Sequence, residues 1–142
     1  IRAAGLAAEL ASARQLLESD GISFEYSLGE VEISADQETV LALVVREAIT
    51  NIQRHAHARH AAVFLDSSHG ELRLRIGDDG KGSSMVAGNG LMGMRERVEA
   101  IGGRLRIDSK NRRGTQIEVT MDLIETNIPV QVSSTQSTLA SD

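Results

Sequence analysis

The chain has 142 residues, of which 41% are hydrophobic and 25% charged, and it contains no cysteine. This length suits one domain with a real core, and the absence of thiols excludes a disulfide framework and a thiolate metal site. The formal net charge of -5 argues against a surface that neutralises a nucleic-acid backbone, so we expect no nucleic-acid partner. No apolar run approaches the roughly 20 residues that cross a bilayer, and a cytoplasmic setting is the default.

The first third of the sequence predicts a helix, a strand and a second helix. Residues 2–19 are mostly good helix formers with leucines at helical spacing, and an Asp-Gly pair follows as a stop. Residues 22–28 alternate between apolar and polar side chains, which is the period of a half-buried strand. Ser34 and Gln37 have the spacing of a capping box, which opens the longest predicted helix, ending near Ala56.

The rest of the chain predicts two hairpins with a loop and a helix between them. Residues 62–65 and 71–76 are β-prone and are joined by a polar turn, which indicates the first hairpin. Residues 77–90 form a glycine-rich loop, and apolar residues at helical spacing follow from Leu91 until a Gly-Gly pair. Residues 105–121 contain the final hairpin. This order favours an α/β sandwich, a mixed, mainly antiparallel sheet covered on one face by about three helices.

The second predicted helix carries a stripe of polar side chains. They stand at offsets of 0, 4, 7 and 8, which an α-helix places along one side: Glu47, Asn51, Arg54 and His55. The amide oxygen of Asn51 can ligate a hard cation such as Mg²⁺, and Glu47 can hold a metal-bound water or act as a base. Arg54 and His55 can meet phosphates. An ordinary solvated helix face explains the same pattern without any ligand.

The glycine-rich loop has the composition of an anion site. The run DDGKG (78–82) follows a predicted strand directly, and GNG (88–90) leads into a predicted helix. Glycines let a backbone approach a ligand, and the free N–H groups at a helix start point at phosphate. A plain linker is the alternative. The spacing matches neither the dinucleotide-binding fingerprint nor the P-loop, so a nucleotide site here requires a different fold.

Four motifs in order resemble those of one family. The runs REAITNIQRHA (46–56), DDGKG (78–82), GNGLMGMRERVEAIGG (88–103) and GT (114–115) are similar to the N, G1 and G2 boxes and the closing motif of sensor histidine kinases. Within that family they most resemble the subfamily of the bacterial nitrate and membrane-fluidity sensors, with its short lid and its G-L-x-G-M-R-E-R signature. The resemblance covers about Ala7 to Leu123, and it implies a Bergerat-type ATP-binding fold.

The resemblance implies roles for the polar side chains of the second helix and for the first aspartate of the loop. Asn51 would ligate Mg²⁺, and Glu47 would stand at the acidic N-box position that assists phosphoryl transfer. Arg54 and His55 would face the phosphates of ATP. Asp78, the first residue of the D-x-G-x-G motif, would accept a hydrogen bond from the adenine amino group.

The same resemblance implies the remaining contacts of the nucleotide. Glycines would make room for the base and let the lid close over the phosphates: Gly80, Gly82, Gly88 and Gly90. The N-terminus of the helix that contains Leu91 would point at the phosphates, and Thr115 would lie near the adenine end. Asp79 and Lys81 fall at variable positions of the G1 box and are given no role.

The function that the resemblance implies is the transfer of the γ-phosphate of Mg-ATP to a histidine. That histidine lies on a dimerisation domain of the parent kinase, which this chain does not supply, and a response regulator is the downstream partner. Residues 1–5 are a possible remnant of the preceding dimerisation helix, residues 6–124 the ATP-binding catalytic domain, and residues 125–142 a tail expected to be disordered. A start at Ile1 suggests a cytoplasmic segment cut from a longer, membrane-bound sensor.

Two other functions fit the same motifs. An ATPase or an anti-sigma serine kinase can share the nucleotide fold, although the G-L-x-G-M-R-E-R run favours a histidine kinase. A nucleotide-binding module without transfer is the third alternative. The presence of both Glu47 and Asn51 argues against such a module, because a decayed site is expected to lose its metal ligand.

Overall fold

The structure is a computed structural model that describes residues 4–80, 89–110 and 114–123. The described elements follow the predicted order: α1 (Ala4–Ser19), β1 (Ser23–Leu28), α2 (Ala35–Asn51), the π-helical turn η1 (Ile52–Ala56), β2 (His60–Ser68), β3 (Glu71–Asp78), α3 (Asn89–Ala100), β4 (Arg104–Lys110) and β5 (Gly114–Asp122). No helix within these ranges is both long and apolar enough to span a membrane.

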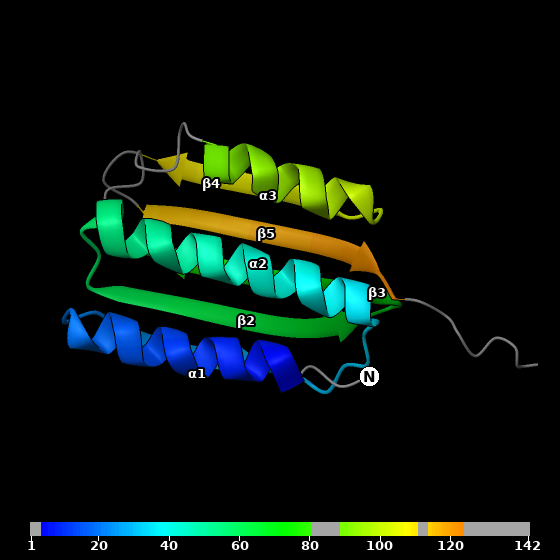
Figure 1. The fold of residues 1–142 in the computed structure, drawn as a ribbon, viewed down its shortest axis with the longest axis horizontal. Coiled ribbons are helices and arrows are strands. Elements are labelled where there is room, and N and C mark those ends of the chain that lie inside the picture. Colours follow the sequence, from blue (N-terminus) through cyan, green and yellow to red (C-terminus); the bar gives the residue numbers. More distant parts are fainter. Residues whose placement is uncertain (1–3, 81–88, 111–113, 124–142) are drawn as a thin grey trace, which may run out of the picture.

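The five strands form one mixed sheet in the order β1-β2-β3-β5-β4. The edge strand β1 pairs with β2 in parallel, and every other neighbouring pair is antiparallel. All three helices lie side by side on one face of this sheet (Figure 1). The α/β sandwich with a mainly antiparallel sheet and both hairpins, as predicted from the sequence, is therefore confirmed.

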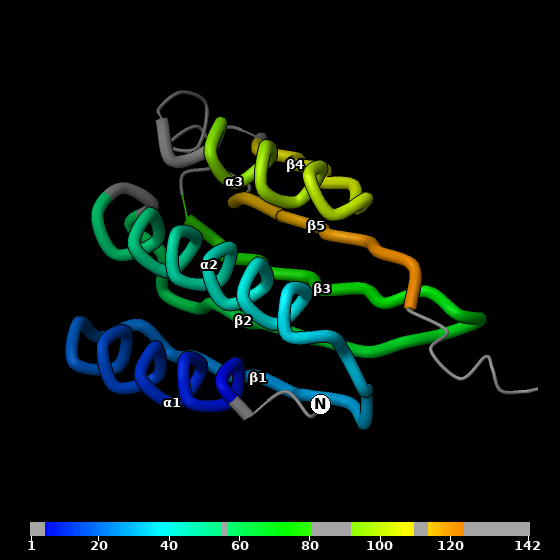
Figure 2. Tube along the Cα trace, turned by 45° about the vertical axis from the view of Figure 1, so that its right-hand side comes forward, coloured from blue at the N-terminus to red at the C-terminus, as the bar shows by residue number. Residues whose placement is uncertain are grey.

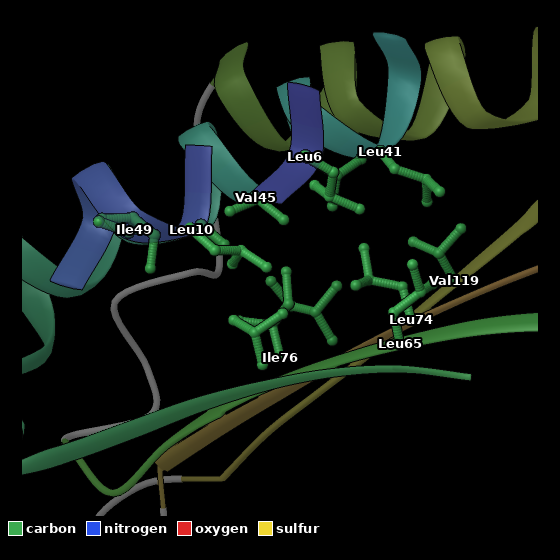
Figure 3. Close-up of a cluster of buried hydrophobic side chains, with 14 of the residues drawn as sticks. Leu6, Leu10, Leu41, Val45, Ile49, Leu65, Leu74, Ile76 and Val119 are labelled. Carbon is green, nitrogen blue, oxygen red and sulfur yellow. The ribbon is translucent and has the colours of Figure 1, made fainter. Parts of the chain in front are cut away.

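The core lies between the helix layer and the facing side of the sheet. Alternate residues of the central strands point into it, and apolar residues at helical spacing meet them from α1 and α2 (Figure 3). The labelled side chains of the cluster are all nearly inaccessible to solvent: Leu6, Leu10, Leu41, Val45, Ile49, Leu65, Leu74, Ile76 and Val119. This single core fixes α2 over the middle of the sheet.

The predicted capping box at the start of α2 is present. The Ser34 hydroxyl accepts a hydrogen bond from the Gln37 N–H at 3.0 Å, and the Gln37 side-chain oxygen accepts one from the Ser34 N–H at 3.0 Å. The amide nitrogen of Gln37 also donates to the Asp122 carbonyl at 3.1 Å. The start of α2 is thereby tied to the end of β5.

Two carboxylates hold α1 against α2. The Glu38 Oε2 atom accepts hydrogen bonds from the Gly5 N–H at 2.6 Å and the Leu6 N–H at 3.2 Å, so a side chain of α2 caps the start of α1. Further along, Arg46 donates to Glu9 at 2.9 Å, and this ion pair raises the pKa of Arg46. The first helix therefore packs in the same domain as α2 and the sheet.

The last turn of the second predicted helix is a π turn. Its α-helical part stops at Asn51, and residues up to Ala56 continue as a π turn before His57 takes a left-handed conformation with φ of 52°. A helical hydrophobic period cannot reveal this change, because the apolar positions alone do not distinguish i→i+4 from i→i+5 bonding over one turn. The helical run therefore ends at Ala56, as predicted, and its last five residues form a π-helix.

Candidate functional site

Four element ends gather at one end of the sandwich. The C-terminal end of α2 with η1, the end of β3, the start of β5 and the start of α3 all lie there, as Figures 1 and 2 both show. The sequence separates these segments by tens of residues, and the antiparallel order of the sheet brings them together. The ends of helices and strands, and the loops that join them, are where polar side chains and free backbone groups are available for a ligand.

A polar row crosses the sheet at this end. Asp78 in β3 lies opposite Thr115 in β5, and Thr115 lies opposite Ser109 in β4. The hydroxyl oxygens of Ser109 and Thr115 are 3.1 Å apart. Asp78 is only 8% exposed and Thr115 only 2%, so both are buried beneath the helix layer. The burial of this polar pair calls for an explanation, because burying polar groups is unfavourable unless they form hydrogen bonds or bind a ligand.

The carboxylate of Asp78 is held in a fixed orientation. Its Oδ1 atom accepts a hydrogen bond from the Gly80 N–H at 2.7 Å, which closes a small loop after the strand. Burial raises the pKa of Asp78, while the Gly80 N–H bond lowers it, the neighbouring Asp79 charge raises it, and a bond from the Thr115 backbone lowers it. A carboxylate has about four lone-pair sites, so it keeps capacity for an amino group of a ligand.

Gly114 explains why a glycine precedes Thr115. It has a φ of 85°, and a Cβ atom at this position would overlap the backbone carbonyl of Asp78. The start of β5 can therefore approach the end of β3 only without a side chain. This contact sets the position of Thr115 opposite Asp78. It explains why a glycine comes before the threonine in the Gly-Thr motif.

The N-box residues Glu47 and Asn51 lie in the C-terminal part of α2. Glu47 and Asn51 are one helical turn apart and both are partly buried. Glu47 borders a hollow of about 160 Å³ between α2 and α3, together with Gly93, Met94 and Arg97. The two residues expected to handle metal and phosphates therefore share one face of the helix, as the sequence predicted.

The polar stripe does not extend regularly beyond Asn51. Arg54 is exposed and belongs to η1, where a π turn holds more residues per turn than an α-helix. The 3.6-residue period that placed Arg54 and His55 in line with Glu47 no longer applies there. The side chain of His55 lies outside the described residues, so phosphate contacts of Arg54 and His55 stay predictions.

The predicted lid falls largely outside the described residues. Gly82 and Gly88 lie beyond the described ranges, while Gly80 is buried beside Asp78. Gly90 and Leu91 belong to the first turn of α3, and the side chain of Leu91 is not among the described ones. The described residues thus include the Asp78 part of the predicted site and the first turn of α3, but not most of the predicted lid.

A larger hollow of about 620 Å³ lies mainly on the sheet face that no described helix covers, and it reaches the end of β3. Its floor contains Ala62 and Gly77, with Phe64, Arg75 and Gln116 around it. These positions alternate along their strands with residues that point into the helix layer, and Asp78 and Asp79 line the hollow where it meets the end of β3. Of the predicted site residues, Asp78 lines this hollow, whereas Thr115 and Glu47 do not.

Asp79 has a role that the sequence did not indicate. Its Oδ1 atom accepts hydrogen bonds from the Arg59 N–H at 2.8 Å and the His60 N–H at 2.9 Å. Partial burial acts to raise the pKa of this carboxyl, but the His60 and Arg59 N–H bonds and the nearby His60 ring outweigh it, so the pKa is lowered. No local pattern signals contacts between residues about 20 positions apart.

The donor set at the site suits a magnesium nucleotide. Mg²⁺ is usually held by one or two protein oxygens together with phosphates and water, so the amide oxygen of Asn51 with Glu47 nearby is compatible with it. Within the described part of the chain, no three or more His, Asp or Glu side chains gather as a closed metal site.

A family model matches the chain over the segment that builds this site. The model for histidine kinase-, DNA gyrase B- and HSP90-like ATPases matches residues 36–125, from the start of α2 to just beyond β5. The sensor histidine kinase YvfT of Bacillus subtilis is 33% identical over 129 residues, covering 88% of this chain and 34% of that protein. The sensor histidine kinase DesK of the same organism is 35% identical over 119 residues, covering 80% and 32%.

Solved structures share the fold at low sequence identity. The histidine kinase domain of a blue-light activated histidine kinase from Erythrobacter litoralis has a TM-score of 0.76 at 20% identity, covering 92% of this chain and 64% of that one. The mycobacterial sensor histidine kinase MprB has a TM-score of 0.69 at 20% identity, covering 87% and 95%. The chain spans about a third of the length of YvfT and DesK. It belongs to the histidine kinase-, DNA gyrase B- and HSP90-like ATPase family, as the catalytic ATPase domain found in sensor histidine kinases.

Proposed function

We propose that this domain binds Mg-ATP and donates the γ-phosphate to a histidine on a dimerisation domain of its parent kinase. The observation that carries the proposal is the buried carboxylate of Asp78, fixed by Gly80 and paired with Thr115 below the end of α2. A buried charge at the meeting point of four element ends is costly unless a ligand or a hydrogen bond uses it.

Asp78 and the N-box residues would divide the recognition of ATP between them. Asp78 accepts a hydrogen bond from the adenine amino group, which selects adenine over guanine, because guanine has an oxygen at that ring position. Asn51 supplies an amide oxygen to the metal, and Mg²⁺ when bound neutralises charge on the phosphate oxygens. Glycines of the lid and the start of α3 meet the phosphates through backbone N–H groups.

The transfer itself depends on position rather than on a covalent intermediate. A ring nitrogen of the acceptor histidine forms a bond to the γ-phosphorus, and the bond to the oxygen between the β- and γ-phosphates breaks, so that ADP leaves. Glu47, one turn before Asn51 and bordering the hollow beside α3, is the residue to which we assign acceptance of the proton that the imidazole loses. The phosphoryl group then passes to an aspartate of a response regulator.

The same proposal extends to the organisation of the parent protein. Residues 6–124 form the catalytic domain, with a dimerisation helix before it and a tail over residues 125–142. The names of the relatives support a sensor kinase as the parent protein. The resemblance of the sequence motifs to the nitrate and membrane-fluidity sensors fits a cytoplasmic domain of a membrane-bound sensor.

Binding and transfer are tested separately. Calorimetric titration with Mg-ADP should give saturable binding, and a lack of binding at millimolar ligand would contradict the proposal. Phosphoryl transfer is then measured with the dimerisation domain added as a second polypeptide. Steady ATP hydrolysis without transfer to histidine would favour an ATPase, and labelling of serine would favour an anti-sigma type kinase.

A further inference from the structure

The connection from the N-box helix to β2 is held by one carboxylate that directly follows β3, that of Asp79. Oδ1 of Asp79 accepts hydrogen bonds from the N–H groups of Arg59 and His60, at 2.8 and 2.9 Å. The Asp79 N–H donates back to the His60 carbonyl at 3.2 Å. Asp79 thus forms hydrogen bonds with the His60 backbone through both its side chain and its own N–H group. The Arg59 carbonyl in turn accepts from the Ser23 N–H at 2.9 Å, so this short stretch is bonded on both sides.

These contacts limit where the N-box helix can end. Only residues 57–59 separate η1 from β2, and His57 already turns the chain with its left-handed conformation. A three-residue link has little freedom once its end is fixed. The position of Arg59 and His60 is therefore transmitted to η1, and through η1 to Asn51 at the end of α2.

Asp79 also adjoins the residue expected to read the base. Asp78 points into the helix layer with its carboxylate fixed by Gly80, and Asp79 follows it directly in the chain. One rigid backbone segment therefore carries both the predicted adenine acceptor and the anchor for the N-box helix. Asp78, which is expected to bind the base, and Asn51, which is expected to bind the metal, are therefore connected through this segment.

We propose that Asp79 is a positioning residue, whose carboxylate fixes the end of the N-box helix relative to Asp78 so that base and metal contacts form on one nucleotide. This assignment rests on the proposed binding of Mg-ATP. In this assignment Asp79 acts on the site through its bonds to Arg59 and His60. The bonds are charge-assisted and short, as is needed for a contact that sets a position.

A purely stabilising role makes a different prediction. Loss of a structural hydrogen bond lowers the melting temperature but leaves the affinity of the folded fraction unchanged. Loss of a positioning contact also weakens nucleotide binding at temperatures where the protein is fully folded. It does so mainly in the part of the affinity that depends on Mg²⁺, because that part requires Asn51 and Asp78 to act together.

The test is titration of Mg-ADP, and of ADP with a chelator, into the Asp79→Ala chain well below its melting temperature. We expect Mg-ADP to bind about tenfold more weakly and ADP without metal to change less than about threefold. The Asp79→Asn variant keeps an oxygen that can accept the same two N–H bonds, and it should recover most of the loss. If Asp79→Ala does not fold, Asp79→Ser takes its place, because its shorter side chain cannot hold both N–H groups.

The control variant is Gln37→Ala, at the opposite end of α2. It removes the capping-box bond and the link to Asp122, so it should lower the melting temperature without changing the affinity for Mg-ADP. Unchanged affinity in Asp79→Ala with a lower melting temperature would overturn the positioning role while leaving the proposed function intact. Failure of the unaltered chain to bind either ligand would overturn both together.

Discussion

Gly114 lies so close to Asp78 that a Cβ atom at position 114 would overlap the Asp78 carbonyl oxygen. The contact joins the start of β5 to the end of β3 and places Thr115 opposite Asp78. A motif that reads only as Gly-Thr in the sequence is thus a steric requirement of the site. The carboxylate proposed to read the base thus lies in a segment whose packing requires a glycine from another strand.

The first prediction concerns this glycine. Gly114→Ala should lower the free energy of unfolding by more than about 3 kcal/mol, because a positive φ and a backbone overlap act together. Matched controls are Gly70→Ala and Gly102→Ala, which also have positive φ but no atom within 4 Å of the added Cβ. Denaturant unfolding should show about 1–2 kcal/mol for each control. Equal losses at all three positions would show that the contact with Asp78 is unimportant.

The second prediction concerns base selection by Asp78. Asp78→Asn should weaken ATP and ADP binding alike, by about ten- to a hundredfold, because a charge-assisted acceptor is lost. Binding of GTP should change far less, so the preference for adenine should fall. Competition titrations with both nucleotides measure this ratio. An unchanged preference would mean that another group reads the base.

A third prediction separates the metal from the base. Asn51→Ala should remove most of the increase in ADP affinity that Mg²⁺ provides, while leaving ADP binding in chelator nearly unchanged. Thr50→Ala, a change at the preceding residue of the same helix, serves as the control. Titrations with and without Mg²⁺ measure the ADP affinity in chelator and the increase in that affinity when Mg²⁺ is present. Equal losses under the two conditions in Asn51→Ala would assign Asn51 a role other than metal binding.

The fourth prediction uses the opposite pKa shifts of the two adjacent aspartates. The raised pKa of Asp78 means that its contribution to stability is complete below the unfolded pKa of about 3.9 and is lost as pH rises through the folded pKa. The lowered pKa of Asp79 means that its contribution is complete above about 3.9 and is lost as pH falls through the folded pKa.

Unfolding free energies measured from about pH 3 to about pH 7 should therefore diverge for the two variants. Relative to the unaltered chain, Asp78→Asn should become more stable as pH rises, and Asp79→Asn should become less stable. The loss for Asp79→Asn at neutral pH should reach about 1–2 kcal/mol. Slopes of the same sign in both variants would contradict the two assignments.

Much of the fold could be predicted because its signals are local. The capping box of Ser34 and Gln37 needs only its own spacing, and the alternation along β3 marks which residues face the core. Asp78 and Thr115 could be singled out by their motifs, and the sheet then places them opposite each other. Short-range patterns thus located the candidate site.

Other features depend on tertiary contacts that no local pattern contains. Glu38 caps a helix that lies 33 residues earlier in the chain, and Asp79 bonds backbone groups about 20 residues away. The π turn after Asn51 changes the number of residues per turn, so the α-helical period does not apply between Glu47 and Arg54. The contacts that position the site were the ones that the sequence could not reveal.

The most direct test of the proposed function is transfer of labelled γ-phosphate in a mixture of two polypeptides. This chain with Mg-ATP should stay unlabelled, because its four histidines lie within or after the N box, where none occupies the acceptor position on a preceding helix. Addition of the dimerisation domain of the parent kinase should give acid-labile label on that domain, and Asn51→Ala should abolish it. Acid-labile label on this chain alone, or transfer that persists in Asn51→Ala, would contradict the proposed function.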